Sequence, residues 1–393
     1  MVLVVDVFIK PLTRLIFRAP SPFTAGVHGP GAFGISFSYP YPSTITGALS
    51  SIAYTRRLCS GGLTTTAGRE YEDHRDCVKN LISKFLNINK NSIKEIVVRT
   101  GYLVRETESK PEIYPYIGAN IFPTINVLIE KIKLKWSKYN IPGKNGSTRA
   151  LYAKAIEEAY EELFSGGTVK EGNAILAYKR QYKGIALHRN TKTTIARMLY
   201  SIESINYKPS AYIGATIIIK GISSTSNRGE LQEIIKFGKR GLAHVEARTS
   251  STIPLIDHIL NSSSSSRDYL LVLTTPAIIR NPSDLSTNRV LVIDKESRIH
   301  EKLADKLLGR FRIRGEVIYA PKAGVLFEHS LRTVLPGWNT DINRPRMPGL
   351  LVPPGTVIYV HDVGQETIVE TATEGVGEES DLGWGSVVPI PLT

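Results

Sequence analysis

The fold is indicated first by residues 41–53, YPSTITGALSSIA, which predict an amphipathic helix beginning at Ser43 or Thr44. Either hydroxyl suits the N-cap of such a helix. Apolar residues recur there at helical spacing, at Ile45, Ala48, Leu49, Ile52 and Ala53. Upstream, residues 2–9 alternate in the manner of a β-strand. A strand followed by a helix of this kind is typical of an α+β unit, and the rest of the chain extends the pattern.

The spacing of apolar residues predicts further elements along the chain. Helices are expected over residues 73–86, 148–164, 230–237 and 300–308. Strands are expected over residues 96–102, 126–134, 174–182, 211–220, 269–275, 315–319 and 356–360. Short strands mixed with a few helices favour an α+β fold of two ferredoxin-like (RRM-like, βαββαβ) domains with long insertions. We predict an N-terminal domain over residues 1–205 and a C-terminal domain over residues 206–393.

The chain has a net charge of +13 and a pI near 9.5, and its charge is unevenly distributed. Residues 362–393 hold seven of the 36 acidic residues and no Lys or Arg. All 49 basic and 29 acidic residues therefore lie in residues 1–361, which carry a net charge of +20. A surplus of this size favours a polyanionic partner, nucleic acid first and an anionic membrane second. The charged surface of a thermophilic protein is the alternative interpretation.

Two further observations bear on the setting of the chain. The apolar run over residues 1–9 is interrupted by Asp6 and is too short for a signal peptide or a membrane span, so no membrane partner is expected. Cys59 and Cys77 have no metal-binding spacing and do not suggest a disulfide framework. We therefore expect a reducing, cytoplasmic setting.

Enzyme signatures are weak in this sequence. It contains no Walker A loop, no HExxH and no GxSxG motif. Residues 29–34 match GxGxxG, but a strand rather than a helix is expected directly after them, so no dinucleotide cofactor is predicted. The histidines lack metal-ligand spacing, and no metal site is predicted. His28, in a Gly-rich loop, is the best candidate for acid/base chemistry on RNA, although a loop histidine near phosphates is more often a hydrogen-bond donor.

A segment rich in Lys, Arg and Tyr, residues 170–208, is the strongest candidate for nucleic-acid binding. Its cations would neutralise phosphates, and its tyrosine rings would stack on unpaired bases, which suits single-stranded RNA. The alternative is that the tyrosines are core residues and the charges form a solvated face. The candidate residues of this segment are Lys179, Arg180, Tyr182, Lys183, Arg189 and Lys192.

Two more places are candidates for phosphate contacts. Residues 236–248 form a basic stretch whose glycines would let the backbone approach a phosphate, although an ordinary helix C-terminus would have similar residues. The start of the predicted helix at Ser43 and Thr44 offers free N–H groups, although capping alone would explain those residues. The candidates of the basic stretch are Lys236, Lys239, Arg240, His244 and Arg248.

Several stretches together resemble the RAMP superfamily of CRISPR proteins. Near the N-terminus these are residues 8–18, Pro22-Phe23 and residues 41–49, where a strand leads into a helix beginning P-x-T-hydrophobic-x-G-A-L. Near the C-terminus, the sequence from Gly375 to Gly385 is similar to the superfamily's glycine-rich signature GhGxxxxxGhG, in which h is hydrophobic. Residues 184–203 resemble the middle segment of the third subunit of the type III-B (Cmr) complex.

The resemblance implies a RAMP fold of two ferredoxin-like domains and a non-catalytic subunit that grips the single-stranded 5′ repeat-derived handle of crRNA. It further implies two protein partners, the large polymerase-like subunit and the backbone subunit. Two alternatives stay open: a metal-independent crRNA-processing endoribonuclease that uses His28 or His188, and a scaffold subunit with a basic protein-docking face. With the candidates above, the predicted RNA-binding set also includes Arg18, His28, Ser43, Thr44 and His188. The glycine-rich loop, of structural or binding role, comprises Gly375, Gly377, Gly383, Trp384 and Gly385.

Overall fold

The structure is a computed structural model of the 393-residue chain. It describes residues 2–17, 33–59, 74–107, 111–119, 122–139, 148–164, 173–174, 176–187, 191, 194–222, 231–238, 241–260, 266–280, 299–322, 327–334, 338–339, 344–345 and 349–392. No helix within these residues is long and apolar enough to cross a membrane.

The first sheet has six strands in the order β10-β11-β1-β9-β3-β4. All of its strand pairs are antiparallel. Its four central strands, β11-β1-β9-β3, follow the order of a ferredoxin-like βαββαβ unit in which α1 connects β1 to β3. The strands are β1 Val2–Pro11, β3 Glu95–Arg105, β4 Glu112–Pro115, β9 Ala211–Lys220, β10 Leu231–Phe237 and β11 Gly241–Ser250.

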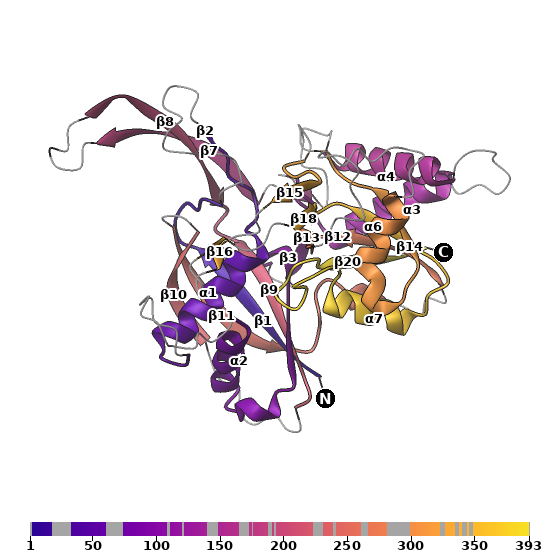
Figure 1. The fold of residues 1–393 in the computed structure, drawn as a ribbon, viewed down its shortest axis with the longest axis horizontal. Coiled ribbons are helices and arrows are strands. Elements are labelled where there is room, and N and C mark those ends of the chain that lie inside the picture. The colour runs from indigo at the N-terminus through magenta and orange to yellow at the C-terminus, as the bar shows by residue number, and fades with distance from the viewer. Residues whose placement is uncertain are drawn as a thin grey trace.

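Helices α1 (Pro42–Thr55) and α2 (His74–Phe85) cover one face of this sheet, as Figure 1 shows. Alternate residues of the central strands, such as Val7 on β1 and Ile213 on β9, are fully buried against Leu49 of α1. A short 3-10 helix, η1 (Lys90–Ser92), leads from α2 into β3. The first unit is therefore a helix layer packed on one face of an antiparallel sheet.

Of residues 230–237, predicted as a helix, residues 231–237 form strand β10 instead. Leu231, Ile235 and Phe237 are buried, while Ile234 and Lys236 between them are exposed, which is the two-residue period of a strand. Short apolar runs fit the period of a helix as well as that of a strand. Here the hydrogen bonding to β11 stabilises the strand. This strand stands where a ferredoxin-like unit would have its second helix.

The second sheet has the order β14-β19-β12-β20, and the chain passes through it as β12-α6-β14-β19-α7-β20. This is a complete βαββαβ unit, which confirms the predicted fold class. Helices α6 and α7 pack on one face of this sheet. The bounds are β12 Asp268–Leu273, α6 Ile299–Leu308, η3 Gly309–Phe311, β14 Gly315–Tyr319, β19 Val357–Val360, α7 Gln365–Glu374 and β20 Val387–Leu392.

Two long helices, α3 (Ile125–Tyr139) and α4 (Thr148–Phe164), cover the other face of the second sheet. Residues 126–134, predicted as a strand, therefore lie in a helix. Leu128, Ile132 and Trp136 are buried at four-residue spacing, and α4 supplies the surface against which they pack. The predicted helix over residues 148–164 is confirmed as α4.

The two sheets are joined by a shared core, because Tyr102 and Val104 of β3 pack in the same cluster as Leu270 of β12. The domain boundary predicted near residue 205 falls inside a strand, β8 (Thr194–Tyr207), and the first sheet continues to Ser250. In chain order, the last strand of the first sheet ends at Ser250 and the first strand of the second sheet begins at Asp268. Sequence spacing could not show that β9 and β11 pair with the first strand of the chain.

The remaining elements are short, apart from a hairpin formed by β7 (Ala177–Leu187) and β8, which extends away from both sheets at the upper left of Figure 1. The short elements are β2 Phe33–Gly34, β5 Phe122–Pro123, β6 Asn173–Ala174, α5 Asp257–Leu260, β13 Ala277–Ile279, β15 Arg332–Val334, β16 Trp338–Asn339, β17 Arg344–Pro345 and β18 Gly349–Val352.

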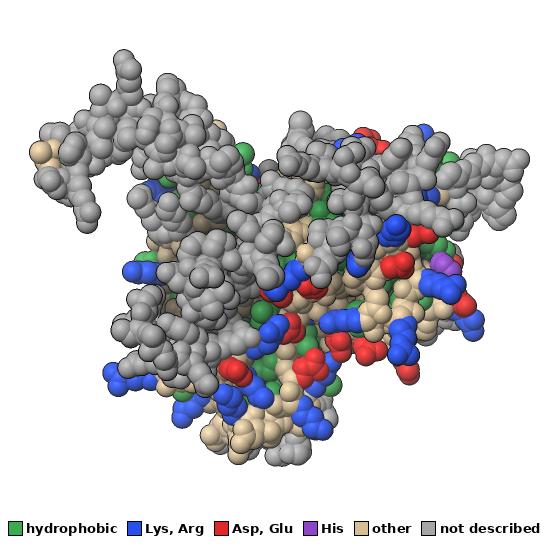
Figure 2. All heavy atoms as spheres, viewed as in Figure 1, with side chains coloured by type: hydrophobic (Ala, Val, Ile, Leu, Met, Phe, Trp, Pro, Cys, Tyr) green, Lys and Arg blue, Asp and Glu red, His purple; other side chains and the backbone are tan. Residues whose placement is uncertain are grey.

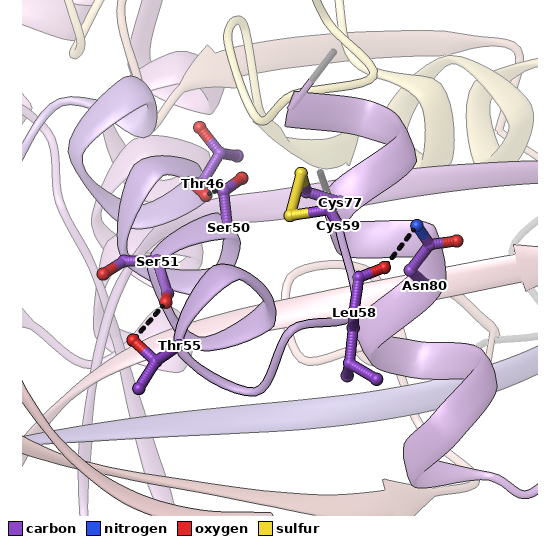
Figure 3. The surroundings of a disulfide bond; sticks show 8 residues. All are labelled: Thr46, Ser50, Ser51, Thr55, Leu58, Cys59, Cys77 and Asn80. Carbon is purple, nitrogen blue, oxygen red and sulfur yellow. Dashed lines mark hydrogen bonds between the residues drawn. A yellow bond between two sulfur atoms is a disulfide. The ribbon is translucent and has the colours of Figure 1, made fainter. Parts of the chain in front are cut away.

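Cys59 and Cys77 form a disulfide, contrary to the expectation from the sequence. Figure 3 shows the bond between the end of the α1 segment and α2, with the side-chain amide of Asn80 donating to the carbonyl of Leu58 at 2.8 Å. Two cysteines 18 positions apart carry no recognisable spacing. It is the packing of α1 against α2 that brings their Cα atoms to 5.4 Å.

Candidate nucleic-acid interface

One face of the β7–β8 hairpin carries an alternation of aromatic and cationic side chains, which we call the hairpin ladder: Tyr178, Arg180 and Tyr182 of β7, with Arg14 from the chain after β1. Side chains at alternate positions of a strand share a face, so the three β7 residues lie on the same side. The Arg180 guanidinium carbon lies 5.2 Å from the Tyr178 ring centroid, and that of Arg14 lies 4.1 Å from the Tyr182 centroid. Tyr178 is 42% exposed.

The contact between Arg14 and Tyr182 also changes the pKa of the tyrosine. The hydrogen bond from Arg14 lowers the pKa of the Tyr182 phenol, because it stabilises the charged form. A guanidinium over an aromatic ring also gains from the ring's quadrupole. Arg14 was not among the residues predicted from the sequence. The only signal for Arg14 in the sequence was its place within residues 8–18, one of the stretches that resemble the RAMP superfamily.

Lys179, predicted to bind RNA, lies on the opposite face of β7 and is held in an internal ion-pair network. Its Nζ is 2.8 Å from Glu328 Oε1 and 3.1 Å from Glu203 Oε2. Burial by itself lowers the pKa of Lys179, but the two carboxylates outweigh it and the net pKa is raised. Glu328 also accepts hydrogen bonds from the backbone and hydroxyl of Ser38 and from the Tyr116 hydroxyl. We therefore reassign Lys179 from phosphate contact to anchoring the hairpin.

Lys183 shares that opposite face but is exposed to solvent. It stays a candidate for phosphate contact. Several other predicted residues lie outside the described part of the chain: Arg18, His28, His188, Arg189, Lys192, Lys239 and Arg240.

The second predicted basic stretch lies on β10 and β11, on the sheet face opposite α1 and α2. Lys236 and Arg248 are exposed and His244 is partly buried. Arg248 donates to Glu246 Oε1 at 2.6 Å, so much of its charge is already compensated. The alternative that this stretch is a helix C-terminus is wrong, because β10 is a strand.

The segment from Leu12 to Leu15 connects this sheet face to the hairpin. At one end the Leu12 N–H donates to the carbonyl of Leu242 on β11 at 2.9 Å. At the other end Leu15 and Ile205 of β8 exchange backbone hydrogen bonds of 2.9 and 2.7 Å. Arg14 lies between these two attachments, so the structure brings the two basic stretches, which are well separated in sequence, to neighbouring positions.

Ser43 and Thr44 do not cap their helix. Helix α1 begins one residue earlier, at Pro42, with Tyr41 as N-cap and no side-chain cap hydrogen bond. Proline suits the first helical position, because it has no N–H to leave unpaired. The side chains of Ser43 and Thr44 are partly buried. The glycine-rich loop lies against this helix start, since a Cβ placed on Gly383 would be 3.4 Å from that of Pro42.

The glycine-rich loop itself is an internal feature. Trp384 is fully buried, with its ring centroid 5.6 Å from that of Tyr41. Gly375 has φ of +72°, a conformation that L side chains rarely adopt, and a Cβ there would overlap the guanidinium of Arg99. Of the two interpretations left by the sequence, this geometry favours the structural one.

Arg99 of β3 ties this loop to the first sheet. Its buried guanidinium donates to the carbonyls of Glu374, at 2.7 Å, and Ser380. Burial, reinforced by the positive charge of Arg310, lowers the pKa of Arg99 to about 9. The loop thus satisfies a buried cation with backbone oxygens, which accounts for its compact, glycine-rich course.

The electrostatics of the described surface are mixed. On the face shown in Figure 2, basic and acidic side chains are interspersed on the side that carries α7. The described residues contain no group of three or more His, Cys, Asp and Glu that could hold a metal ion. The hairpin ladder is therefore the best-defined candidate for binding an anionic ligand.

Comparison with known proteins identifies the family. Residues 160–392 match the model of the family described as CRISPR-associated protein (Cas_Cmr3). No curated protein matches the chain. Similar solved structures include two cryo-EM structures of the type III-B Cmr-beta bound to cognate target RNA. One of them, which also holds AMPPnP, is 16% identical over 90% of this chain and 86% of that chain, with a TM-score of 0.47.

The other is 15% identical over 97% of this chain and 96% of that chain, with a TM-score of 0.49. A Cas6-related protein from Pyrococcus furiosus is 12% identical over 75% of this chain and 98% of that chain, with a TM-score of 0.25. The family model spans more than half of the sequence, including the whole second sheet and the β7–β8 hairpin. The chain therefore belongs to the CRISPR-associated Cas_Cmr3 family.

Proposed function

We propose that this chain is a non-catalytic RNA-binding subunit of a type III-B CRISPR RNA-guided interference complex, the third subunit in the naming of that complex. It grips the single-stranded 5′ repeat-derived handle of crRNA and bridges the large polymerase-like subunit and the backbone subunit. In this role it works in the cytoplasm, with crRNA and other effector subunits as partners. The observation that carries the proposal is the hairpin ladder of Tyr178, Arg180, Tyr182 and Arg14.

The ladder has the chemistry that single-stranded RNA requires. Tyrosine rings provide faces on which unpaired bases stack, and each stacked base contributes about 1–3 kcal/mol. The two guanidinium groups lie over those rings, where they can meet phosphates or stack on bases themselves. The hairpin extends away from both sheets (Figure 1), and Tyr178 of its ladder is 42% exposed.

The internal contacts support the same role. The network of Lys179, Glu203 and Glu328 fixes the base of the hairpin against the body, so that the ladder is presented in a defined orientation. The glycine-rich loop and Arg99 then hold the two sheets together behind it. A hairpin whose base is already rigid loses less conformational entropy of its own when RNA binds.

Binding of the full-length chain to single-stranded RNA as salt is raised tests the proposal. An RNA with the 5′ handle is compared with a scrambled RNA of the same composition. We expect tighter binding to the handle, a negative salt slope and intact RNA afterwards. Arg14→Ala and Arg180→Ala should each weaken binding and reduce the slope by about 0.7 for each phosphate that is no longer neutralised. Arg267→Ala is the matched control, because this exposed arginine lies on the second unit.

Other outcomes would contradict the proposal in distinguishable ways. Unchanged affinity in both ladder variants would show that RNA lies elsewhere. A metal-independent cut in the RNA that His28→Ala or His188→Ala abolishes would favour the processing endoribonuclease. No binding at low salt would favour the scaffold subunit.

A further inference from the structure

Three exposed aliphatic side chains lie at neighbouring positions on the first sheet. Ile234 on β10 is 64% exposed, Leu242 on β11 is 41% exposed, and Leu12 after β1 is 48% exposed. Ile234 is paired with His244 across the two strands, so it is the diagonal neighbour of Leu242 on the same face. Leu12 adjoins Leu242 through a backbone hydrogen bond of 2.9 Å. We call these three residues the aliphatic patch.

Cationic side chains border the aliphatic patch. Lys236 is paired with Leu242, and Lys10 of β1 is paired with His244. Neither lysine forms an ion pair within the described part of the chain. Arg248, farther along β11, forms an ion pair with Glu246, and this leaves that part of the face close to neutral. The face is therefore apolar with an uncompensated positive border, and it is complementary to an apolar surface that carries carboxylates.

Aromatic rings on the same sheet face are not available for stacking on bases. Phe8 and Tyr212 pack edge to face, with centroids 6.3 Å apart, and both are partly buried against the core shared by the two sheets. The Tyr212 hydroxyl donates to Glu106 at 2.8 Å. The most exposed apolar atoms are thus aliphatic, which favours a protein over RNA as the occupant.

The position of the patch adds to this argument. Strand β10 is an edge strand, and β11 is its only pairing partner among the described strands. An exposed edge with an apolar face is a site where another chain adds contacts. We propose that the aliphatic patch, bordered by Lys10 and Lys236, docks an acidic, apolar segment of a neighbouring protein subunit. This inference rests on the proposed function only in placing the chain among other subunits.

Assembly of this chain with the other subunits tests this proposal directly. The effector complex is reconstituted from its subunits and crRNA. We then measure how much of this chain co-purifies with the tagged large subunit and, in a separate experiment, with the tagged backbone subunit. Ile234→Glu should reduce recovery with one of them by at least about tenfold, because it buries a charge in an apolar contact. Lys236→Glu should also reduce recovery, whereas Lys236→Arg should not. The control is Leu134→Glu, at a leucine of α3 that is 55% exposed and outside the patch.

Amide hydrogen exchange in the assembled complex provides an independent measurement. We expect β10 and β11 to exchange more slowly in the complex than in the free chain, and to remain protected after ribonuclease treatment. Handle binding by the isolated Ile234→Glu chain should match the wild type, which keeps this test separate from the RNA test. A normal thermal melt of each variant shows that the chain is folded.

Three results would overturn the inference. Full recovery of Ile234→Glu together with unchanged exchange would show that the patch docks nothing in the complex. Protection that disappears with the RNA, together with weaker handle binding by Ile234→Glu, would assign the face to RNA. A wild-type dimer in solution that Ile234→Glu converts to a monomer would assign it to a second copy of the chain.

Discussion

The Lys179 ammonium lies 2.8 Å from Glu328 Oε1 and joins the base of the β7–β8 hairpin to the chain between β14 and β15. Glu328 is almost completely buried, with 7% of its side chain exposed. A buried carboxylate of this kind depends on its cation, because the alternative is an uncompensated charge in a poorly solvated place. The relationship explains why a lysine in the most basic, tyrosine-rich segment of the chain is directed inward.

Replacing Lys179 with alanine should destabilise the fold. The change leaves Glu203 and Glu328 facing each other without a cation, and we expect a loss of about 3 kcal/mol in the free energy of unfolding. Urea denaturation followed by circular dichroism measures it. Lys183→Ala is the control, since this lysine is exposed on the same face of β7, and it should change stability by less than about 0.5 kcal/mol. Equal stability of the two variants would contradict the anchoring role.

Replacing Tyr178 with alanine should weaken RNA binding. If the ring stacks on a base, the loss should be about 1–3 kcal/mol, roughly five- to 150-fold in Kd, with little change in salt slope. Fluorescence anisotropy with a labelled handle RNA measures both quantities. Tyr54→Ala is a matched control, because Tyr54 on α1 is 44% exposed against 42% for Tyr178. A similar loss in both variants would point to a nonspecific effect of removing a surface ring.

Removing the disulfide should lower stability. Cys59 and Cys77 close a short loop, and the chain-entropy model assigns such a crosslink about 3 kcal/mol. We expect Cys59→Ser to reduce the free energy of unfolding by about that amount. A reductant should produce a similar loss in the wild type and none in the variant. A wild-type chain whose denaturation is insensitive to reductant would show that the crosslink does not contribute.

Stability at acidic pH should depend on Glu162 of α4. Lys131 and Lys135 of α3 lie 2.7 and 2.8 Å from its two carboxylate oxygens, and their hydrogen bonds lower its pKa to about 2. A depressed carboxylate pKa stabilises the folded state above the unfolded pKa, near 4.3, and this contribution is lost as pH falls towards 2. Because the pair is partly exposed, its contribution should be at most about 1 kcal/mol.

Glu162→Gln should therefore be less stable than the wild type at pH 7 and should lose less stability between pH 4.5 and 2. Thermal melts across this range measure the difference. Glu366→Gln, at an exposed position of α7, is the control and should follow the wild-type curve. Parallel curves for Glu162→Gln and the wild type would show that the ion pairs do not link α3 to α4 energetically.

Much of the fold could be predicted from local pattern. The helix over residues 148–164 and the strand over residues 211–220 have the expected bounds. Residues 126–134 and 230–237 were assigned to the wrong element type. Both are short apolar runs that fit either period, and their neighbours in space decide between strand and helix.

The candidate site was predictable in part. The sequence predicts an RNA-binding segment over residues 170–208, and the structure places Arg180 and Tyr182 of that segment on one face of β7. Arg14 was missed because it comes from a distant part of the chain and meets Tyr182 only through folding. Lys179 was assigned to RNA because its two carboxylate partners are likewise distant in sequence.

The sequence by itself determined the α+β class, the strongly basic body and the motifs that resemble the RAMP superfamily, since periodicity, charge and spacing are properties of neighbouring residues. Only the tertiary structure decided which cations face solvent, that Cys59 and Cys77 are bonded, and that the glycine-rich loop encloses Arg99. Each of these depends on contacts between residues far apart in the chain. Such contacts form through the packing of whole elements, which no local pattern encodes.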